Sequence, residues 1–141
     1  MRIVSLFLVI ALIVAGLAGY GQPKLEYTSM VAAGGMATVG LKSDGTVNAV
    51  GWNDYGQCNV GNWTSIANVA AGIYHTVGVK SNRTVLAVGD NNRGQCDVDS
   101  WTGVVKVAAG LYHTVGTKSD GTAVAIGGND YGQCNVSNWT D

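Results

Sequence analysis

The stretch that decides the fold is VAAGIYHTVGVK, residues 69–80, because close copies of it stand on either side at a fixed spacing. It recurs as VAAGGMATVGLK at residues 31–42 and as VAAGLYHTVGTK at residues 107–118, an offset of 38 residues each time. A Gly-Gln-Cys element recurs with the same offset and ends at Cys58, Cys96 and Cys134. A period of this size is typical of solenoids, propellers and other repeat arrays. The chain therefore divides into repeat 1 (31–68), repeat 2 (69–106) and repeat 3 (107–141), the last stopping short of its full period.

Each repeat has the composition of short β-strands. Glycine interrupts the sequence too often for a helical repeat, while valine and threonine, which favour strands, dominate between the glycines. In repeat 2 we expect a strand over Tyr74–Lys80, a turn over Ser81–Arg83 and a return strand over Thr84–Gly89. Shorter apolar pieces flank this hairpin around Val69–Ala71 and Cys96–Val98. Four short strands in about 38 residues predict an all-β chain of β-propeller blades, with a parallel β-solenoid as the alternative.

The hairpin turn differs in one repeat. Repeats 1 and 3 place Gly45 and Gly121 where a three-residue loop needs a left-handed residue. Repeat 2 places Arg83 there, which predicts a modest strain unless Asn82 adopts the positive φ instead.

These residues carry a family resemblance. The pattern Val-Ala-Ala-Gly-x-Tyr-His-Thr-Val-Gly, then Lys-Ser-Asp-Gly-Thr, then Gly-Gln-Cys resembles the regulator of chromosome condensation repeat over residues 31–141. The resemblance implies blades of a propeller that commonly has seven. The 38-residue unit is more similar to compact bacterial members, such as the propeller-type β-lactamase inhibitory protein, than to the nuclear founding member. Because three blades do not close a ring, we expect further copies beyond Asp141.

The first 18 residues have the form of a targeting segment. Arg2 precedes a nearly uninterrupted apolar run, Ile3–Ala18, that ends in small residues, which is typical of a secretory signal peptide cleaved after Ala18. The alternative is an uncleaved membrane anchor over residues 3–20. In either case the rest of the chain is expected to be secreted or extracytoplasmic. Residues 19–30 are then a spacer, or a strand that closes the last blade.

The nuclear founding member exchanges nucleotide on a small GTPase, and an exported chain would not meet that partner. We therefore do not carry this activity over. Nucleic acid is excluded as a partner on charge, since 8 basic and 9 acidic residues give a net charge of −1 and form no runs. A membrane is expected as a partner only through an uncleaved N-terminal segment.

No residue pattern predicts catalysis, a metal or a cofactor. The three cysteines take the same place in successive blades, too far apart for disulfides, and are expected to be small buried side chains. His75 and His113 share one repeat position with Ala37, which argues against a shared catalytic role and favours a buried histidine bonded to nearby backbone.

The three copies differ where a binding surface would be expected. Two variable positions flank the asparagine before Gly-Gln-Cys, in a loop that should lie at one end of every blade. Tryptophan, tyrosine and arginine in such loops are typical of binding hot spots. The candidate binding residues are Trp52, Tyr55, Asp90, Arg93 and Tyr131. A third position, Met36, Tyr74 and Tyr112, also varies.

The sequence thus favours a non-catalytic exported propeller scaffold that binds an extracellular protein or a surface ligand. One alternative is a fragment of a propeller enzyme, a lyase or hydrolase, with its active site in blades beyond this sequence. Another is a structural surface or adhesion repeat protein. The recurring tryptophans Trp63, Trp101 and Trp139 are expected to pack between blades in any of these cases.

Overall fold

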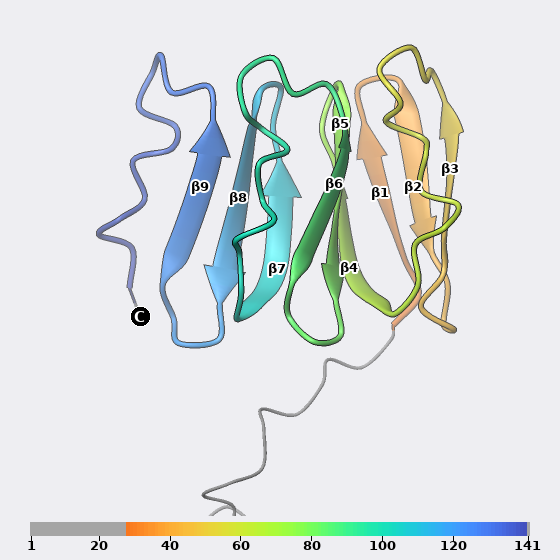
Figure 1. Ribbon diagram of the computed structural model, residues 1–141, viewed down its shortest axis with the longest axis horizontal. Coiled ribbons are helices and arrows are strands. Elements are labelled where there is room, and N and C mark those ends of the chain that lie inside the picture. Colours follow the sequence, from red (N-terminus) through yellow and green to blue (C-terminus); the bar gives the residue numbers. More distant parts are fainter. Residues whose placement is uncertain (1–27, 141) are drawn as a thin grey trace, which may run out of the picture.

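The computed structural model describes residues 28–140, so the predicted signal peptide or anchor and most of the spacer lie outside the described residues. Three antiparallel sheets stand side by side in chain order (Figure 1). Blade 1 contains β1 (Met30–Gly34), β2 (Ala37–Leu41) and β3 (Val47–Gly51). Blade 2 contains β4 (Ile66–Ala71), β5 (His75–Lys80) and β6 (Val85–Gly89). Blade 3 contains β7 (Val104–Ala109), β8 (His113–Lys118) and β9 (Ala123–Gly127).

The predicted hairpin is confirmed in each blade. In blade 2, β5 pairs with β6 from His75 opposite Gly89 to Val79 opposite Val85. The strain at the turn falls on Arg83, which has a φ of 69° where Gly45 and Gly121 have 78° and 84°. Asn82 instead accepts hydrogen bonds through its side-chain oxygen from the backbone N–H and the hydroxyl of Thr84.

The prediction of four strands per blade is wrong, since each described blade has three. The segment around Cys96–Val98 forms consecutive tight turns, in which Val98 N–H donates to the Cys96 carbonyl and Trp101 N–H to that of Val98. The side-chain oxygen of Asn91 also accepts a hydrogen bond from the Cys96 N–H. These local bonds satisfy the backbone without a neighbouring strand, and so compete with strand formation.

The core lies between blades rather than inside one of them. One buried cluster joins Val39 of blade 1, and Val60 and Trp63 of the loop after it, to Ile66 and Val69 on β4 of blade 2. A second cluster repeats this arrangement between blades 2 and 3, around Trp101. The prediction for the tryptophans is confirmed at Trp63 and Trp101, which are buried, whereas Trp139 after β9 is 61% exposed.

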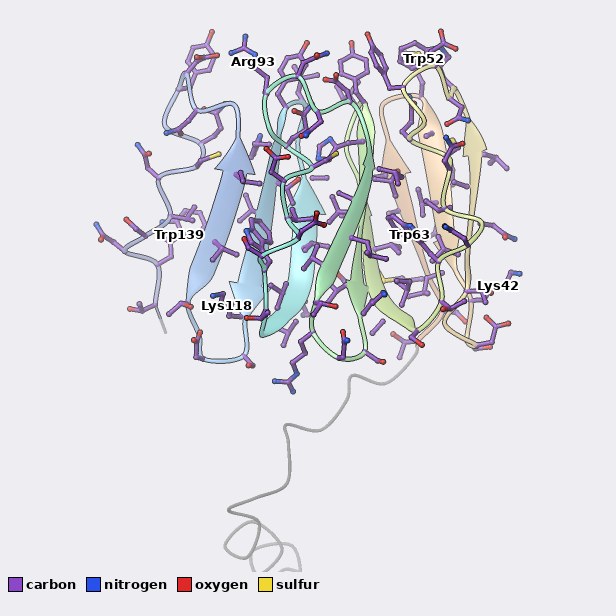
Figure 2. All side chains as sticks on the ribbon, in the orientation of Figure 1. Lys42, Trp52, Trp63, Arg93, Lys118 and Trp139 are labelled. Carbon is purple, nitrogen blue, oxygen red and sulfur yellow. The ribbon has the colours of Figure 1, made fainter. Side chains whose placement is uncertain are left out.

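The two ends of the blades differ in character. The hairpins that join second to third strands lie at one end, where Figure 2 shows Lys42 and Lys118. The loops that follow β3, β6 and β9 lie at the other end, which carries Trp52 and Arg93 (Figures 1 and 2). We call this second end the loop face. Within the described residues no helix is long and apolar enough to cross a bilayer.

The packing of Trp63 on blade 2 generates a prediction. A Cβ at Gly78 would lie 2.7 Å from Cζ3 of Trp63, whereas a Cβ at Gly40, the same repeat position in blade 1, would meet only the Asn48 carbonyl at 4.0 Å. Gly78→Ala should therefore lower the free energy of unfolding by about 1–3 kcal/mol because the indole must move. Gly40→Ala is the matched control and should leave stability nearly unchanged. Urea denaturation measures both, and an equal loss in the two variants would contradict packing of the indole against the glycine.

Candidate binding site on the loop face

Invariant side chains of the repeat build the loops of this face. In repeat 2, the side-chain oxygen of Gln95 accepts the Arg93 backbone N–H at 2.9 Å, and that of Asn91 accepts the Cys96 N–H at 2.8 Å. The Asn91 amide also donates to Asp97. The same bonds recur in the other repeats through Asn53, Gln57, Asn129 and Gln133. Each loop is thus held in shape mainly by its invariant asparagine and glutamine, and most of its variable side chains take no part in these bonds.

A threonine of the next blade fixes the loops of repeats 1 and 2 in place. The Thr76 hydroxyl, on β5, donates to the Gln57 carbonyl at 2.8 Å, and the Thr114 hydroxyl, on β8, donates to the Gln95 carbonyl at 2.7 Å. Both threonines are fully buried. Neighbouring loops therefore keep a constant spacing across the loop face.

The variable residues of two different loops meet at this face. His75, at the start of β5, is paired with Gly89, at the end of β6. The residues just outside these ends are therefore neighbours, and Asp90 N–H donates to the Tyr74 carbonyl at 2.8 Å. Trp52 makes the same backbone bond to Met36, and Gly128 makes it to Tyr112.

Aromatic rings form a continuous row over blades 1 to 3. The Trp52 ring lies edge-on to Tyr55 and to Tyr74, with ring centroids 5.3 Å and 5.8 Å apart. Tyr55 contacts Tyr74 at 5.4 Å, and Tyr74 contacts Tyr112 at 5.9 Å. The three contacts among Trp52, Tyr55 and Tyr74 are edge-to-face pairs, which stabilise one another beyond their buried area, whereas the rings of Tyr74 and Tyr112 are tilted by 32°. The row is therefore ordered before any partner binds.

Charged side chains continue the row. The Arg93 guanidinium lies 5.9 Å from the centre of the Tyr112 ring and 3.1 Å from the Asp130 carboxylate. Both partners of this ion pair are more than half exposed, so it contributes little to stability. Tyr131, the next residue, is 95% exposed. This end of the row presents a cation and an exposed phenol to solvent.

Asp90 faces inward, unlike the other predicted site residues. It is buried, and its carboxylate accepts hydrogen bonds from the Gln95 side-chain amide at 2.7 Å and from the backbone and side chain of Asn92. Asp90 therefore holds its own loop, and it is one of the residues that line a hollow of about 220 Å³.

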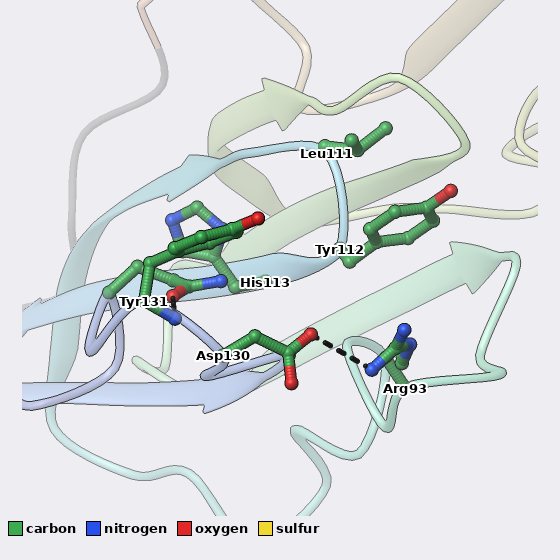
Figure 3. A pocket seen from close by; sticks show the side chains of 8 residues that line it. Arg93, Leu111, Tyr112, His113, Asp130 and Tyr131 are labelled. Carbon is green, nitrogen blue, oxygen red and sulfur yellow. Dashed lines mark hydrogen bonds and ion pairs between the residues drawn. The ribbon is translucent and has the colours of Figure 1, made fainter.

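A larger hollow lies at the equivalent place in repeat 3. It measures about 510 Å³ and is lined by eight residues (Figure 3): Arg93, Leu111, Tyr112, His113, Gly128, Asp130, Tyr131 and Gln133. Gly128 stands here where repeat 2 has Asp90. Within the described residues, the hollow thus opens where the repeat lacks a side chain.

His75 is buried, as predicted, but the predicted backbone partner is wrong. Its Nε2 lies 2.9 Å from the Thr114 hydroxyl of the next blade. Since that hydroxyl already donates to Gln95, it accepts here, and Nε2 carries the proton. Nδ1 is buried without a hydrogen-bond partner. Burial, and next the charge of His113, lower the pKa of His75 to about 4, although Asp90 opposes this shift.

The cysteines match their predicted structural role in part. Each is half-buried rather than fully buried, and each thiol points at a carbonyl of its own loop, as Cys96 does to Asp90 at 3.3 Å. None of the three forms a disulfide. Burial, and next the carboxylates of Asp90 and Asp97, raise the pKa of Cys96 to about 11. Its thiol therefore stays protonated near neutral pH and is a poor nucleophile.

The structure brings together four of the five predicted site residues at the surface: Trp52, Tyr55, Arg93 and Tyr131. Tyr74 and Tyr112 also lie on this surface, and the prediction from sequence does not include them although both positions vary between repeats. The pairing of the hairpin ends would have placed them beside Asp90 and Gly128. Asp130 and Gln133, which line the larger hollow, were also missed, since they belong to the shared pattern of the loops.

The three repeats match a known family of repeats. The family model described as the regulator of chromosome condensation (RCC1) repeat matches residues 31–57, 66–95 and 104–133, more than half of the chain. No curated protein sequence matches the chain significantly.

Solved structures share the blade arrangement. Yeast RCC1 (Prp20), solved with Kap60 bound, is 21% identical with a TM-score of 0.62, covering 74% of this chain and 31% of that one. Human WBSCR16 is 19% identical with a TM-score of 0.65, covering 85% and 40%. The ectodomain of the Arabidopsis thaliana receptor kinase ACR4 is 26% identical with a TM-score of 0.57, covering 70% and 36%. The chain spans well under half the length of these proteins.

The surroundings of His75 predict a pH-dependent stability. A pKa lowered from 6.5 to about 4 means that the unfolded chain takes up the proton first, so stability present above pH 6.5 is lost as the pH falls. We expect a loss of about 2.5 kcal/mol between about pH 7.5 and about pH 4.5. His75→Ala, which copies Ala37 of repeat 1, should remove most of this dependence while lowering stability at neutral pH. Urea denaturation at several pH values tests this, and an equally steep loss in the variant would rule out His75 as its source.

Proposed function

The chain belongs to the regulator of chromosome condensation repeat family, and on that premise we propose that it is an exported, non-catalytic scaffold that binds a protein through the loop face. Propellers of this family generally serve as protein-binding scaffolds. The protein named RCC1 (Prp20) was solved with Kap60 bound, and its binding to Gsp1p and histones has been described. These partners belong to that protein, and the proposal takes over only the class of partner.

The observation that carries the proposal is the continuous row from Trp52 through Tyr55, Tyr74 and Tyr112 to Arg93. Tyrosine, tryptophan and arginine are the side chains most often found at the energetic centre of protein interfaces. A row that is already ordered lowers the entropy lost on binding. The hydrogen bonds that shape the loops are made mainly by the invariant asparagine and glutamine, so the residues of the row can vary between repeats.

Export rests on the N-terminal sequence. Arg2 followed by the apolar run Ile3–Ala18 is the observation that supports it, with cleavage after Ala18 or retention as an anchor as the two outcomes. An extracellular partner follows from export. Because the chain covers only part of the known propellers, a catalytic role carried by further blades, or a structural surface array, stands as the alternative.

Two double variants on opposite ends of the blades test the proposal. Tyr55→Ala with Tyr112→Ala removes two exposed rings of the row, while Lys42→Ala with Lys118→Ala alters the hairpin end (Figure 2). Extracellular proteins of the source organism would be captured on the wild-type chain, and the affinity of a retained protein measured by biolayer interferometry. We expect the tyrosine variant to bind roughly 1,000-fold more weakly, since hot-spot residues contribute about 2 kcal/mol each.

The lysine variant should bind and unfold as the wild type does. The tyrosine variant should still unfold in one cooperative transition, at a lower denaturant concentration because it loses ring contacts to Trp52 and Tyr74. Binding that survives loss of the tyrosines but not of the lysines would move the interface to the hairpin end and overturn the proposal. N-terminal sequencing of the exported chain separately tests cleavage after Ala18.

A further inference from the structure

The three repeats treat one position of the loop face in three ways. Trp52 fills it with an indole, Asp90 with a carboxylate and Gly128 with no side chain. Each of these residues follows the third strand of its blade and makes the same backbone bond to the neighbouring turn. The three sites can therefore be compared atom by atom.

Repeat 2 shows what chemistry this position accepts. The Asp90 carboxylate sits over the side-chain amide of Gln95, whose nitrogen donates to it at 2.7 Å. In repeat 1 the indole of Trp52 offers no acceptor, and the corresponding nitrogen of Gln57 is buried without a partner. The side-chain nitrogen of the repeat's glutamine is thus a hydrogen-bond donor. A carboxylate at the neighbouring position accepts from it, as in repeat 2, whereas an indole there leaves it without an acceptor, as in repeat 1.

Repeat 3 keeps the donor and lacks the acceptor. Gln133 uses its side-chain oxygen to accept the Tyr131 N–H at 2.9 Å, and its nitrogen has no partner among the described residues. It lines the 510 Å³ hollow together with Gly128. Gly128 takes the repeat position of Asp90 and adds no side chain beside this amide.

A cation stands at the rim of the same hollow. One guanidinium nitrogen of Arg93 donates to the Asp130 carboxylate, and the guanidinium lies over the Tyr112 ring. Its other N–H groups have no protein partner in the described part of the chain. A guanidinium carries five donors and can bind a second carboxylate beside Asp130. Leu111 and Tyr112 add an apolar wall that would cover the methylene groups of an incoming side chain (Figure 3).

We propose that the hollow beside Gly128 binds the carboxylate of an aspartate or glutamate side chain of the protein partner. The carboxylate takes the place that Asp90 fills in repeat 2, accepting from the Gln133 amide and from Arg93. This inference rests on the proposed function, because it assigns an acidic anchor to the partner that docks on the loop face.

The chain offers a variant that fills the site from within. A Cβ at Gly128 would lie 3.4 Å from Cβ of Tyr112 and 3.9 Å from Cγ of Arg93, which is ordinary contact, and its φ is not left-handed. Gly128→Asp should therefore fold and place its own carboxylate on Gln133. Gly128→Ala is the control that adds a methyl group without a charge.

The test uses N-acetyl-aspartate N-methylamide as the side-chain probe and NMR spectra of the ¹⁵N-labelled chain. We expect millimolar binding that shifts the Gln133 side-chain amide and the Arg93 Nε–H signals of the wild type and of Gly128→Ala. The neutral N-acetyl-asparagine N-methylamide should bind roughly tenfold more weakly, since charge-assisted hydrogen bonds are lost. In Gly128→Asp the probe should cause no shift, and the free Gln133 amide signals should move towards those of Gln95.

Other outcomes would overturn the proposal. These are no shift at Gln133 or Arg93, equal binding of the neutral probe, or undiminished binding by Gly128→Asp. N-acetylglycine, which carries only a terminal carboxylate, separates the two sources of the same chemistry, and tighter binding of it would assign the hollow to a chain terminus. If the acidic probe fails while the tyrosine variant still loses its partner, the acidic anchor is wrong and the loop face remains the interface.

Discussion

The close approach of an indole to a glycine on the next sheet is the contact on which this structure depends. Adjacent blades share no strand pairing, so only side chains and loop bonds join them. Trp63 lies against Gly78, and Trp101 lies against Gly116 in the same way. A side chain at Gly78 or Gly116 would force the indole to move and so disturb the packing of the two buried clusters between the sheets.

That contact also governs the loop face. Because the blades keep a constant spacing, Thr76 and Thr114 reach the carbonyls of the preceding loops and hold them in register. The invariant asparagine and glutamine of each loop then satisfy its backbone from within. The shared residues thus make most of the bonds that shape the loops. Of the positions that differ between repeats, Asp90 also bonds within its loop, and the others form the aromatic row and line the two hollows.

Much of the fold followed from the repeats themselves. The period of 38 residues, the hairpin and the packing of Trp63 and Trp101 were all predictable, because each arises from local pattern or from a requirement common to every blade. The fourth strand was predicted wrongly, since the apolar Cys96–Val98 resembles a strand while its backbone bonds go to turns and to Asn91. The partner of His75 was missed because Thr114 lies 39 residues away, in the next blade.

The sequence by itself determined the blade, its hairpin and the list of positions that vary between copies, since these depend on spacing and side-chain type. Only the tertiary structure decided which variable residues meet. Tyr74 and Tyr112 join the row because paired strand ends bring two loops together, and Asp90 turns inward because Gln95 offers it a donor. The hollow beside Gly128 likewise depends on the tertiary structure, because residues from neighbouring loops surround the position where this repeat has no side chain.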